Sequence, residues 1–411
     1  VHHPLTRMAR FSALLTMTLA SFTAVAQDCS TGRYVNANLF ADVNVTQGVV
    51  FGSNTGVSGS SQTLRMDVYE PSGDSEQLRP VVVVAFGGSF ITGTRGDVAF
   101  ICNDLAKRGY VAVANDYRVG FFLPNQTTTT RAVMRGAHDM RACVRYLRRS
   151  VAEMGNPYRI DTTRIIIGGV SAGAISALHA MYLDQDAEVP AVLASELPGL
   201  GGLEGSSGSP GYSSRAMACY SFSGALGDSA WIEPGDEPLV SLHEVGDNIV
   251  PYYTAPVFVG GIPTGLTASG SHDLHLRAGH IGITNCLKSY DANAHVGYLQ
   301  SDQANALDYV AVFMGELVCG QSVTCGLSTS VAEVGKAQPL QCTPNPASTT
   351  TRLSLPSASD LSVIDMQGRV VERIRGCIGT VELDLTNLPA GAYTVRPSNP
   401  DLGAVRLLKA D

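Results

Sequence analysis

The sequence has few charged residues and no basic stripe. Charged side chains make up 16% of its 411 residues, and the formal net charge is −8. Nucleic-acid-binding proteins present clustered lysine and arginine, so this composition argues against a nucleic-acid partner. Beyond the N-terminal region, no segment approaches the roughly eighteen apolar residues that a membrane-spanning helix needs. We therefore expect neither a nucleic-acid partner nor a stable transmembrane anchor.

The N-terminal region has the pattern of a signal peptide. Arg7 and Arg10 provide positive charge before an apolar run over residues 11–20, which is too short to be a good membrane span. Residues 24–26, Ala-Val-Ala, are the small residues that a signal peptidase reads. We predict that residues 1–26 are a signal peptide and that the protein is secreted or displayed at the cell surface.

The sequence also lacks any C-x-x-C pair, although it contains nine cysteines. Their spacing does not suggest zinc, and we expect no metal and no organic cofactor. In the oxidising compartment that export implies, some cysteines should pair, while their odd number leaves at least one free or intermolecular. The spacing allows a local bridge between Cys319 and Cys325, and the other pairings remain open.

Strand-like and helix-like segments alternate through the first three quarters of the chain. Such alternation indicates βαβ units, so we expect an α/β fold with a mostly parallel central sheet flanked by helices. The expected strands include residues 43–51, 64–69, 81–86, 110–117, 165–167, 216–225, 239–245 and 286–290. The alternation over 64–69 is typical of a half-buried edge strand. The expected helices include residues 98–108, 131–153, 271–283 and 301–318.

Composition changes at about residue 320, where a stretch rich in Ser, Thr, Gly and Pro begins. Such a stretch is typical of a linker, which we place at 320–343. Short alternating strands with turn signals follow, and they predict a small all-β sandwich at 344–411. Residues 27–319 are then the catalytic α/β domain.

The segment RIIIGGVSAGAISAL, residues 164–178, has the order strand, G-x-S-x-G, helix. In this order the motif indicates a nucleophile elbow, a tight turn that projects a serine from the C-terminal edge of the sheet. Ser171 is the candidate nucleophile. We expect a strained backbone at Ser171, and glycine at positions 169 and 173 because a Cβ there would collide with neighbouring backbone.

A serine hydroxyl needs a base that a third group orients, and in this fold class the chain order is serine, acid, histidine. Asp247 directly follows the expected strand at 239–245 and is the candidate acid. Glu244 and Asp228 are weaker alternatives, because neither sits directly beyond a strand.

The candidate base is His295, which follows the last expected strand and precedes the closing helix. His280 shares its His-x-Gly form but falls within an expected helix, where we expect it to be exposed. His138 and His179 fall on helical stretches and are expected to fill core or surface positions.

Acyl transfer also needs hydrogen-bond donors aimed at the developing oxyanion. The backbone amides of Gly88 and Ser89, after the expected strand at 81–86, are candidates. Ala172, directly after the candidate nucleophile, is the third.

Three aromatic residues are candidates for a substrate pocket, namely Phe86, Phe90 and Trp231, with the core as an equal alternative for each. The loops at 119–130 and 188–214 are expected to shape this pocket.

Residues 62–318 resemble the α/β-hydrolase superfamily, in particular carboxylesterases of its hormone-sensitive-lipase-like and feruloyl/acetyl-esterase-like branch. The likeness rests on FGGSF (86–90), DYRVG (116–120), IDTTRIIIGGVSAGA (160–174), GDNIVPY (246–252) and AHVGY (294–298). It implies an α/β-hydrolase fold and carries that family's catalytic roles to Ser171, Asp247 and His295. It also carries the oxyanion-binding role to the amides of Gly88, Ser89 and Ala172.

Three positions depart from the pattern of these esterases. Phe86 stands where a histidine is usual, and Ser89 stands where the third glycine is usual. Glu244 stands where a glycine is common, after the histidine at 243.

Residues 344–411 resemble the C-terminal sorting domain of the type IX secretion system. The matching segments are PNPAS (344–348), DMQGRVV (365–371), LTNLPAGAYTVR (385–396) and VRLLK (405–409). The resemblance implies transport across an outer membrane by the type IX machinery, with removal of the tail and release or anchoring at the cell surface.

Together these patterns predict a secreted serine carboxylic-ester hydrolase with a Ser-His-Asp triad and an acyl-enzyme intermediate. Its substrate would be a small-molecule or polymer-linked ester, with short-chain esters, acetylated or feruloylated glycans and synthetic polyesters all open. The alternatives are a serine peptidase of the same fold and a non-catalytic surface adhesin that retains the fold.

Overall fold

The computed structural model describes residues 29, 31–325, 340–366, 369–399 and 402–411. The expected signal peptide and most of the expected linker lie outside these ranges. The chain divides into two compact units, Val1–Gly326 and Leu327–Asp411. Within the described ranges, no helix combines the length and the apolar character needed to cross a membrane.

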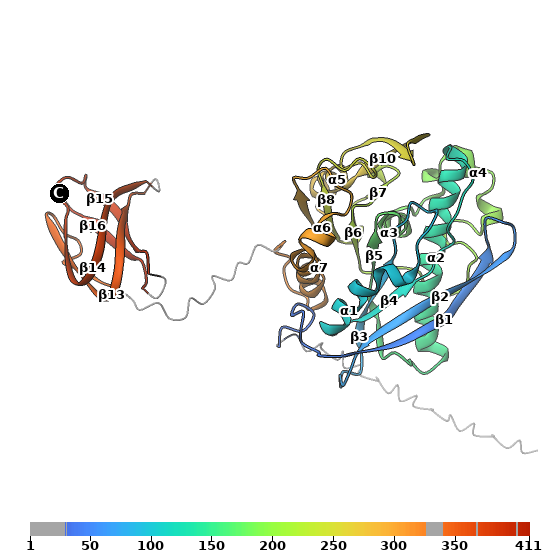
Figure 1. Ribbon diagram of the computed structural model, residues 1–411, viewed down its shortest axis with the longest axis horizontal. Coiled ribbons are helices and arrows are strands. Elements are labelled where there is room, and N and C mark those ends of the chain that lie inside the picture. The colour runs from blue at the N-terminus through green and yellow to red at the C-terminus, as the bar shows by residue number, and fades with distance from the viewer. Residues whose placement is uncertain (1–28, 30, 326–339, 367–368, 400–401) are drawn as a thin grey trace, which may run out of the picture. The chain divides into compact units, whose positions relative to one another are not determined.

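An eight-stranded sheet forms the centre of the first unit, in the order β1-β2-β4-β3-β5-β6-β8-β11 (Figure 1). β2 pairs antiparallel with both of its neighbours, and the six strands from β4 to β11 run parallel. The expected α/β class with a mostly parallel sheet is confirmed. The strands are β1 Val43–Thr55, β2 Ser61–Pro71, β3 Arg79–Ala85, β4 Val111–Asn115, β5 Ile160–Val170, β6 Ala218–Phe222, β8 Leu239–Glu244 and β11 Asn285–Tyr290.

Helices cover both faces of this sheet. The chain moves in one direction from β3 to β4 and in the opposite direction from β4 to β5, and crossover connections are right-handed, so α1 and α2 lie on opposite faces. α7 contacts α1, and α3 contacts α2. The helices are α1 Ala99–Lys107, α2 Gln126–Glu153, α3 Ala172–Tyr182, α4 Ala191–Ala194, α5 Ser271–His280, α6 Tyr298–Ser301 and α7 Gln303–Val318.

This double cover explains the continuous apolar runs of the central strands. Every residue of β3 is buried, and Ile165–Ile167 of β5 are buried as well. β3 and β5 are parallel neighbours with Ala85 opposite Gly169. The loops that follow these two strands therefore emerge side by side at one edge of the sheet.

Several expected elements differ from those in the structure, and two of the differences have a clear physical reason. The expected edge strand at 64–69 is part of β2, which is paired on both sides, and the edge strand is β1. Alternation reports that one face of a strand is less buried, but it does not report whether its backbone is paired on both sides. α2 begins at Gln126 rather than at residue 131, because Asn125 caps it by accepting a hydrogen bond from the amide of Thr128.

The disulfides correct another expectation. Cys319 and Cys325 do not bond to each other; Cys319 pairs with Cys29 and Cys325 pairs with Cys286. Both cysteines follow the closing helix, and the fold brings each one within bonding distance of a segment that is remote in sequence, with Cα–Cα separations of 6.0 and 5.2 Å. The free cysteines of the described chain are all buried, namely Cys102, Cys143, Cys219, Cys342 and Cys377.

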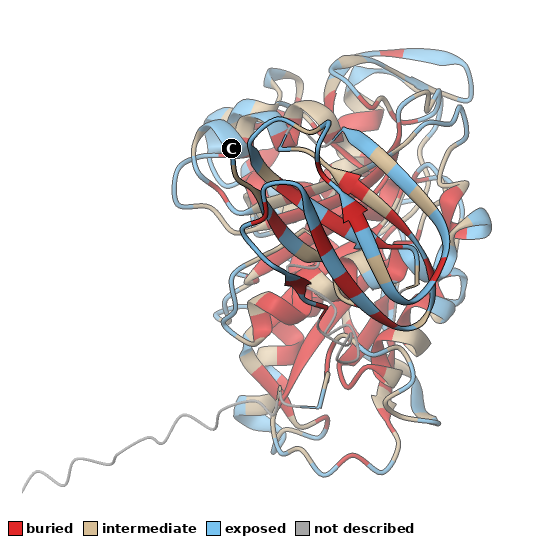
Figure 2. Ribbon diagram, turned by 90° about the vertical axis from the view of Figure 1, so that its left-hand side faces the viewer, coloured by how far each residue is buried: buried red, intermediate tan, exposed pale blue. Residues whose placement is uncertain are grey.

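The second unit is all-β and antiparallel, with its own apolar core. β13 pairs with β14 along one side, and on its other side it pairs with β12 near Leu353 and with β15 near Val363. Buried and exposed residues alternate along β13 and β15, as expected from the sequence (Figure 2). The strands are β12 Cys342–Thr343, β13 Thr350–Ile364, β14 Val370–Asp384, β15 Gly391–Pro397 and β16 Val405–Lys409.

Candidate active site

Ser171 occupies the tight turn between β5 and α3, and its backbone is strained. Its φ of +53° lies in the region that L-residues rarely adopt. A Cβ on Gly169 would lie 2.4 Å from the carbonyl oxygen of Ala85, and a Cβ on Gly173 would lie 2.2 Å from the same atom. Both glycines are therefore required by the close approach of β3, and together they allow the sharp turn that presents the Ser171 hydroxyl.

His295 connects the Ser171 hydroxyl to a carboxylate. Its Nε2 lies 2.7 Å from Ser171 Oγ, and its Nδ1 lies 2.6 Å from Asp247 Oδ2. Because the carboxylate can only accept, Nδ1 carries the proton and Nε2 is free to accept the proton of the serine hydroxyl. The structure thus brings together three predicted residues that come from loops after β5, β8 and β11. A hydroxyl held in this way can be deprotonated as it attacks a carbonyl carbon.

The side chain of Asp247 is fully buried and held on both of its oxygens. The amides of Ile249 and Val250 donate to Oδ1 at 2.8 and 3.0 Å, and His243 Nε2 lies 3.3 Å from Oδ2. Burial alone would raise the pKa of Asp247, but the hydrogen bonds from His243 and His295 outweigh it and lower the pKa below its usual range. The carboxylate is therefore charged and immobile beside the imidazole.

Glu244 supports the loop that carries His295, a role that the sequence did not suggest. It is the last residue of β8 and only 1% exposed. Its carboxylate accepts hydrogen bonds from the amides of Val296 and Tyr298, at 3.0 and 3.2 Å. Val296 has a φ of +52°, so these bonds fix a strained turn directly after the histidine. The available signal was a carboxylate at the end of a strand that begins with the apolar pair Leu239 and Val240.

The alternative acid and base candidates lie elsewhere. Asp228 caps a short 3₁₀ turn, Ser229–Trp231, by accepting a hydrogen bond from the Ala230 amide. His280 is exposed at the C-terminal end of α5, as expected. His138 is buried among arginines, and burial lowers its pKa to about 3.

The loop after β3 lies against Ser171. A Cβ on Gly87 would lie 3.4 Å from Ser171 Cβ, and Gly88 has a φ of +120° that favours glycine. The amides of Ile91 and Thr92 fold back onto the Gly88 carbonyl. Within the described part of the chain, the N–H groups of Gly88 and Ser89 donate no hydrogen bond, so they are free to bind an anion beside the serine.

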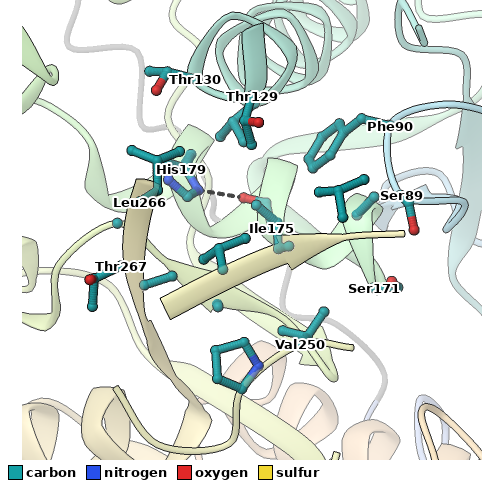
Figure 3. A pocket seen from close by; sticks show the side chains of 18 of the residues that line it. Ser89, Phe90, Thr129, Thr130, Ser171, Ile175, His179, Val250, Leu266 and Thr267 are labelled. Carbon is teal, nitrogen blue, oxygen red and sulfur yellow. Dashed lines mark hydrogen bonds between the residues drawn. The ribbon is translucent and has the colours of Figure 1, made fainter. Parts of the chain in front are cut away.

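An apolar cavity of about 160 Å³ begins at Ser171. Ser89 and Ala172 also line it, so the amide donors and the hydroxyl share one end of the space. Figure 3 shows Ser171 and Ser89 near one another, with Ile175 and His179 further along the cavity. The apolar lining includes Val133, Met134, Ile175, Leu183, Val250 and Leu266.

The three aromatic candidates separate into two groups. Phe90 and Trp231 line the cavity. Phe86 does not, because its ring stacks on Tyr117 with centroids 4.3 Å apart and packs against Gly93. The assignment of Phe86 to the pocket is therefore corrected in favour of the core alternative. The Phe86 ring packs against the loop after β3, and the Tyr117 hydroxyl donates a hydrogen bond to the Phe86 carbonyl at the start of that loop.

A hairpin that the sequence did not single out forms another wall of the cavity. β9, Ala255–Val259, pairs with β10, Ile262–Gly270, which in turn pairs with β7, Ala225–Leu226. The hairpin contributes Phe258 and Leu266, among others, and β10 also contacts α2. Of the two loops expected to shape the pocket, 119–130 contributes Thr129 and Thr130, and 188–214 contributes Pro190. The short strands of the hairpin have weak periodicity, which hid them among turn residues.

No group of three or more histidine, cysteine, aspartate or glutamate side chains is placed to hold a metal ion in the described ranges.

A mostly parallel sheet with helices on both faces, and a serine on a strained turn after a central strand, define the α/β-hydrolase class. Residues 66–198 match the family model BD-FAE, and residues 342–405 match the model of the secretion system C-terminal sorting domain. The first unit thus has the α/β-hydrolase fold and is similar over part of its length to the BD-FAE family, and the second unit is similar to the secretion system C-terminal sorting domain. The sorting domain indicates export to the cell surface or the medium.

Two curated insect esterases are similar to part of the chain. Juvenile hormone esterase of Tribolium castaneum is 31% identical over 132 residues, and esterase B1 of Culex pipiens is 26% identical over 131 residues. Each match covers 31% of this chain, and 22% and 24% of the two relatives respectively. The chain therefore spans less than a quarter of the length of these relatives.

Among solved structures, esterase 2 of Thermogutta terrifontis is similar in two of its forms. The form phosphoramylated by tabun is 21% identical, with a TM-score of 0.47, over 68% of this chain and 96% of that one. The butyrate-bound form is 21% identical, with a TM-score of 0.45, over 70% of this chain and 98% of that one.

Proposed function

We propose that this protein is an exported serine carboxylic-ester hydrolase that works through an acyl-enzyme intermediate. The observation that carries the proposal is the pair of hydrogen bonds made by His295, 2.7 Å to Ser171 Oγ and 2.6 Å to Asp247 Oδ2. The serine stands at the mouth of an apolar cavity that suits an acyl group. The matches to esterases support the same assignment.

In the acylation step, Ser171 Oγ attacks the ester carbonyl carbon while its proton passes to His295 Nε2. The carbonyl oxygen becomes an oxyanion, and the N–H groups of Gly88, Ser89 and Ala172 donate to it. When the tetrahedral intermediate collapses, the carbon–oxygen bond to the alcohol breaks. His295 gives its proton to the departing alkoxide, which leaves as the alcohol.

Deacylation repeats these steps with water in place of serine. His295 removes a proton from a water molecule as its oxygen attacks the acyl-enzyme, and then returns the proton to Ser171 Oγ. Asp247 stays ionised and holds His295 in the tautomer with the proton on Nδ1, which also stabilises the imidazolium that forms in each half-reaction.

The mature protein is expected to hydrolyse p-nitrophenyl butyrate and to react with a fluorophosphonate probe. Ser171→Ala should lower kcat about 10⁶-fold and abolish labelling, because it removes the nucleophile. The matched control is Ser195→Ala, which changes an exposed serine on the segment after α4 and should keep both activities. Labelling that persists in Ser171→Ala would refute the assignment.

The same assays distinguish an ester hydrolase from a serine peptidase and from a non-catalytic adhesin. A peptidase would release p-nitroaniline from peptide anilides faster than p-nitrophenol from the ester. An adhesin that retains the fold would neither turn over the ester nor take up the probe.

A further inference from the structure

The cavity beyond Ser171 is apolar, yet its walls hold two buried polar groups that lack partners. Thr129 is 5% exposed, and its hydroxyl makes no hydrogen bond within the described residues. Its neighbour Thr130 satisfies its own hydroxyl by donating to the Gln126 carbonyl at 2.7 Å. An unpaired buried hydroxyl is costly. The Thr129 hydroxyl is itself shielded from the cavity, so a ligand group would complete it after a rotation about χ1, which threonine in a helix permits.

His179 is the second polar group. Its Nδ1 lies 2.8 Å from the Ile175 carbonyl, which can only accept, so Nδ1 carries the proton and Nε2 is an acceptor. Nε2 has no hydrogen-bond partner in the described part of the chain. The ring is 8% exposed and lies edge-on to Trp231, with centroids 5.7 Å apart. Burial lowers the pKa of His179 to about 4, so the acceptor is present at neutral pH.

The positions along α3 set the distance between this acceptor and the nucleophile. Ser171, Ile175 and His179 follow one another at intervals of four residues, so they share one face of the helix. At a rise of about 1.5 Å per residue, the Cα of His179 lies about 12 Å along the helix axis from the Cα of Ser171. Figure 3 shows this order, with Ile175 between the other two residues.

We propose that the cavity selects acyl groups that carry a hydroxyl at their distal end, which donates to His179 Nε2 and meets the Thr129 hydroxyl on the α2 wall. This inference rests on the proposed esterase function and names its substrate class. Ile175 and the other apolar residues of the cavity contact the methylene groups between the ester carbonyl and the distal hydroxyl.

The span predicts the length of the preferred acyl group. The Cα separation of about 12 Å is an upper limit for this span, because the imidazole of His179 folds back to the Ile175 carbonyl. The span must hold one covalent bond to Ser171 Oγ, the acyl chain, and one hydrogen bond of about 2.8 Å to His179. At most about 8 Å then remains for the chain, which allows a hydroxyl up to about six bonds from the carbonyl carbon. The 6-hydroxyhexanoyl group is the longest chain that meets this limit, and the heptanoyl group replaces its hydroxyl with a methyl group of similar size.

The test compares kcat/KM for p-nitrophenyl 6-hydroxyhexanoate and p-nitrophenyl heptanoate on the mature protein at pH 7.5. We expect kcat/KM to be about tenfold higher for the hydroxy ester. A cavity without a polar partner for the hydroxyl would instead favour the heptanoate. A heptanoate preference would overturn the inference and leave the esterase assignment intact. Hydrolysis of neither ester would overturn both.

Variants assign the preference to the two residues. His179→Leu should reverse it, and Thr129→Val should reduce it severalfold. Thr127→Val is the matched control, because Thr127 lies on the same helix but does not line the cavity, and it should keep the wild-type ratio. A preference that survives in both His179→Leu and Thr129→Val would contradict the assignment. Thr129→Val is nearly isosteric, so it gives an answer even if His179→Leu does not fold.

Discussion

At the scale of single residues, the site depends on carboxylates that do different work. Asp247 orients the imidazole of His295, whereas Glu244 orients the backbone that carries it. A carboxylate that accepts two backbone amides fixes a turn more firmly than packing alone, because each lost bond would leave a buried N–H unpaired. Glu244 is therefore a positioning residue, and its effect on catalysis should be separable from its effect on folding.

We predict that Glu244→Gln lowers kcat about 10- to 100-fold with little change in KM. The glutamine side chain has one acceptor oxygen and one NH₂ donor, so it can no longer accept hydrogen bonds from the backbone N–H groups of both Val296 and Tyr298 through two oxygens. The rate of fluorophosphonate labelling should fall in parallel, since it reports the reactivity of Ser171 in the absence of a bound ester. Glu244→Asp should recover part of the loss.

The control for this variant is Glu237→Gln, since Glu237 pairs with the largely exposed Arg215. It should leave kcat and labelling unchanged. If Glu244→Gln loses thermal stability but labels at the wild-type rate, the role of Glu244 is structural only.

At the scale of elements, much of the architecture could be predicted because its signals are local. The apolar runs at 81–86 and 165–167 indicate buried parallel strands, and both are confirmed. The G-x-S-x-G turn and the positions of Asp247 and His295 after strands singled out residues that the structure places within hydrogen-bonding distance.

The remaining features depend on contacts between segments remote in sequence, which composition and periodicity do not encode. The partner of Cys319 is Cys29, 290 residues away, and only the packed fold brings them together. The ring of Phe86 stacks on Tyr117, which is 31 residues away in the sequence, and does not line the pocket. Glu244 could not be recognised as a support for the His295 loop until that loop was placed above it.

The β9–β10 hairpin gives an element-scale prediction. Replacing residues 256–267 with a short Gly-Ser loop removes Phe258 and Leu266 from the cavity wall, so medium acyl chains lose apolar contact. We expect KM for p-nitrophenyl hexanoate to rise about tenfold or more, while kcat/KM for the acetate ester changes less than threefold. Equal losses on both esters would mean that the hairpin supports the Asp247 loop rather than the cavity.

At the scale of the whole molecule, buried histidines make the stability of the first unit depend on pH. Burial lowers the pKa of His138 to about 3, and lowers that of His179 and of His275 to about 4. Below about pH 6.5 the unfolded chain takes up protons at these positions and the folded chain does not. The free energy of unfolding is therefore independent of these histidines above about pH 6.5, and it decreases progressively as the pH falls toward 4.

We predict that the urea midpoint of the first unit falls steeply between pH 6.5 and 4.5. The slope of the free energy of unfolding against pH should correspond to an uptake of roughly two to three protons on unfolding. His275→Gln should lower that uptake by about one proton. His280→Gln, which changes an exposed histidine on the same helix, should not alter it. The lowered pKa of Asp247 acts in a separate window, because its contribution is lost only below about pH 4. A midpoint that stays constant from pH 6.5 to 4.5 would contradict the prediction.

The two disulfides close inside the hydrolase domain. Cys319 and Cys325 both precede residue 326, and the tail's Cys342 and Cys377 are free, so no cross-link of the described chain passes from the enzyme to its tail. A single cleavage of the chain between the two units would remove the sorting domain and leave both disulfides intact. Removal of the tail therefore costs the first unit none of its covalent cross-links.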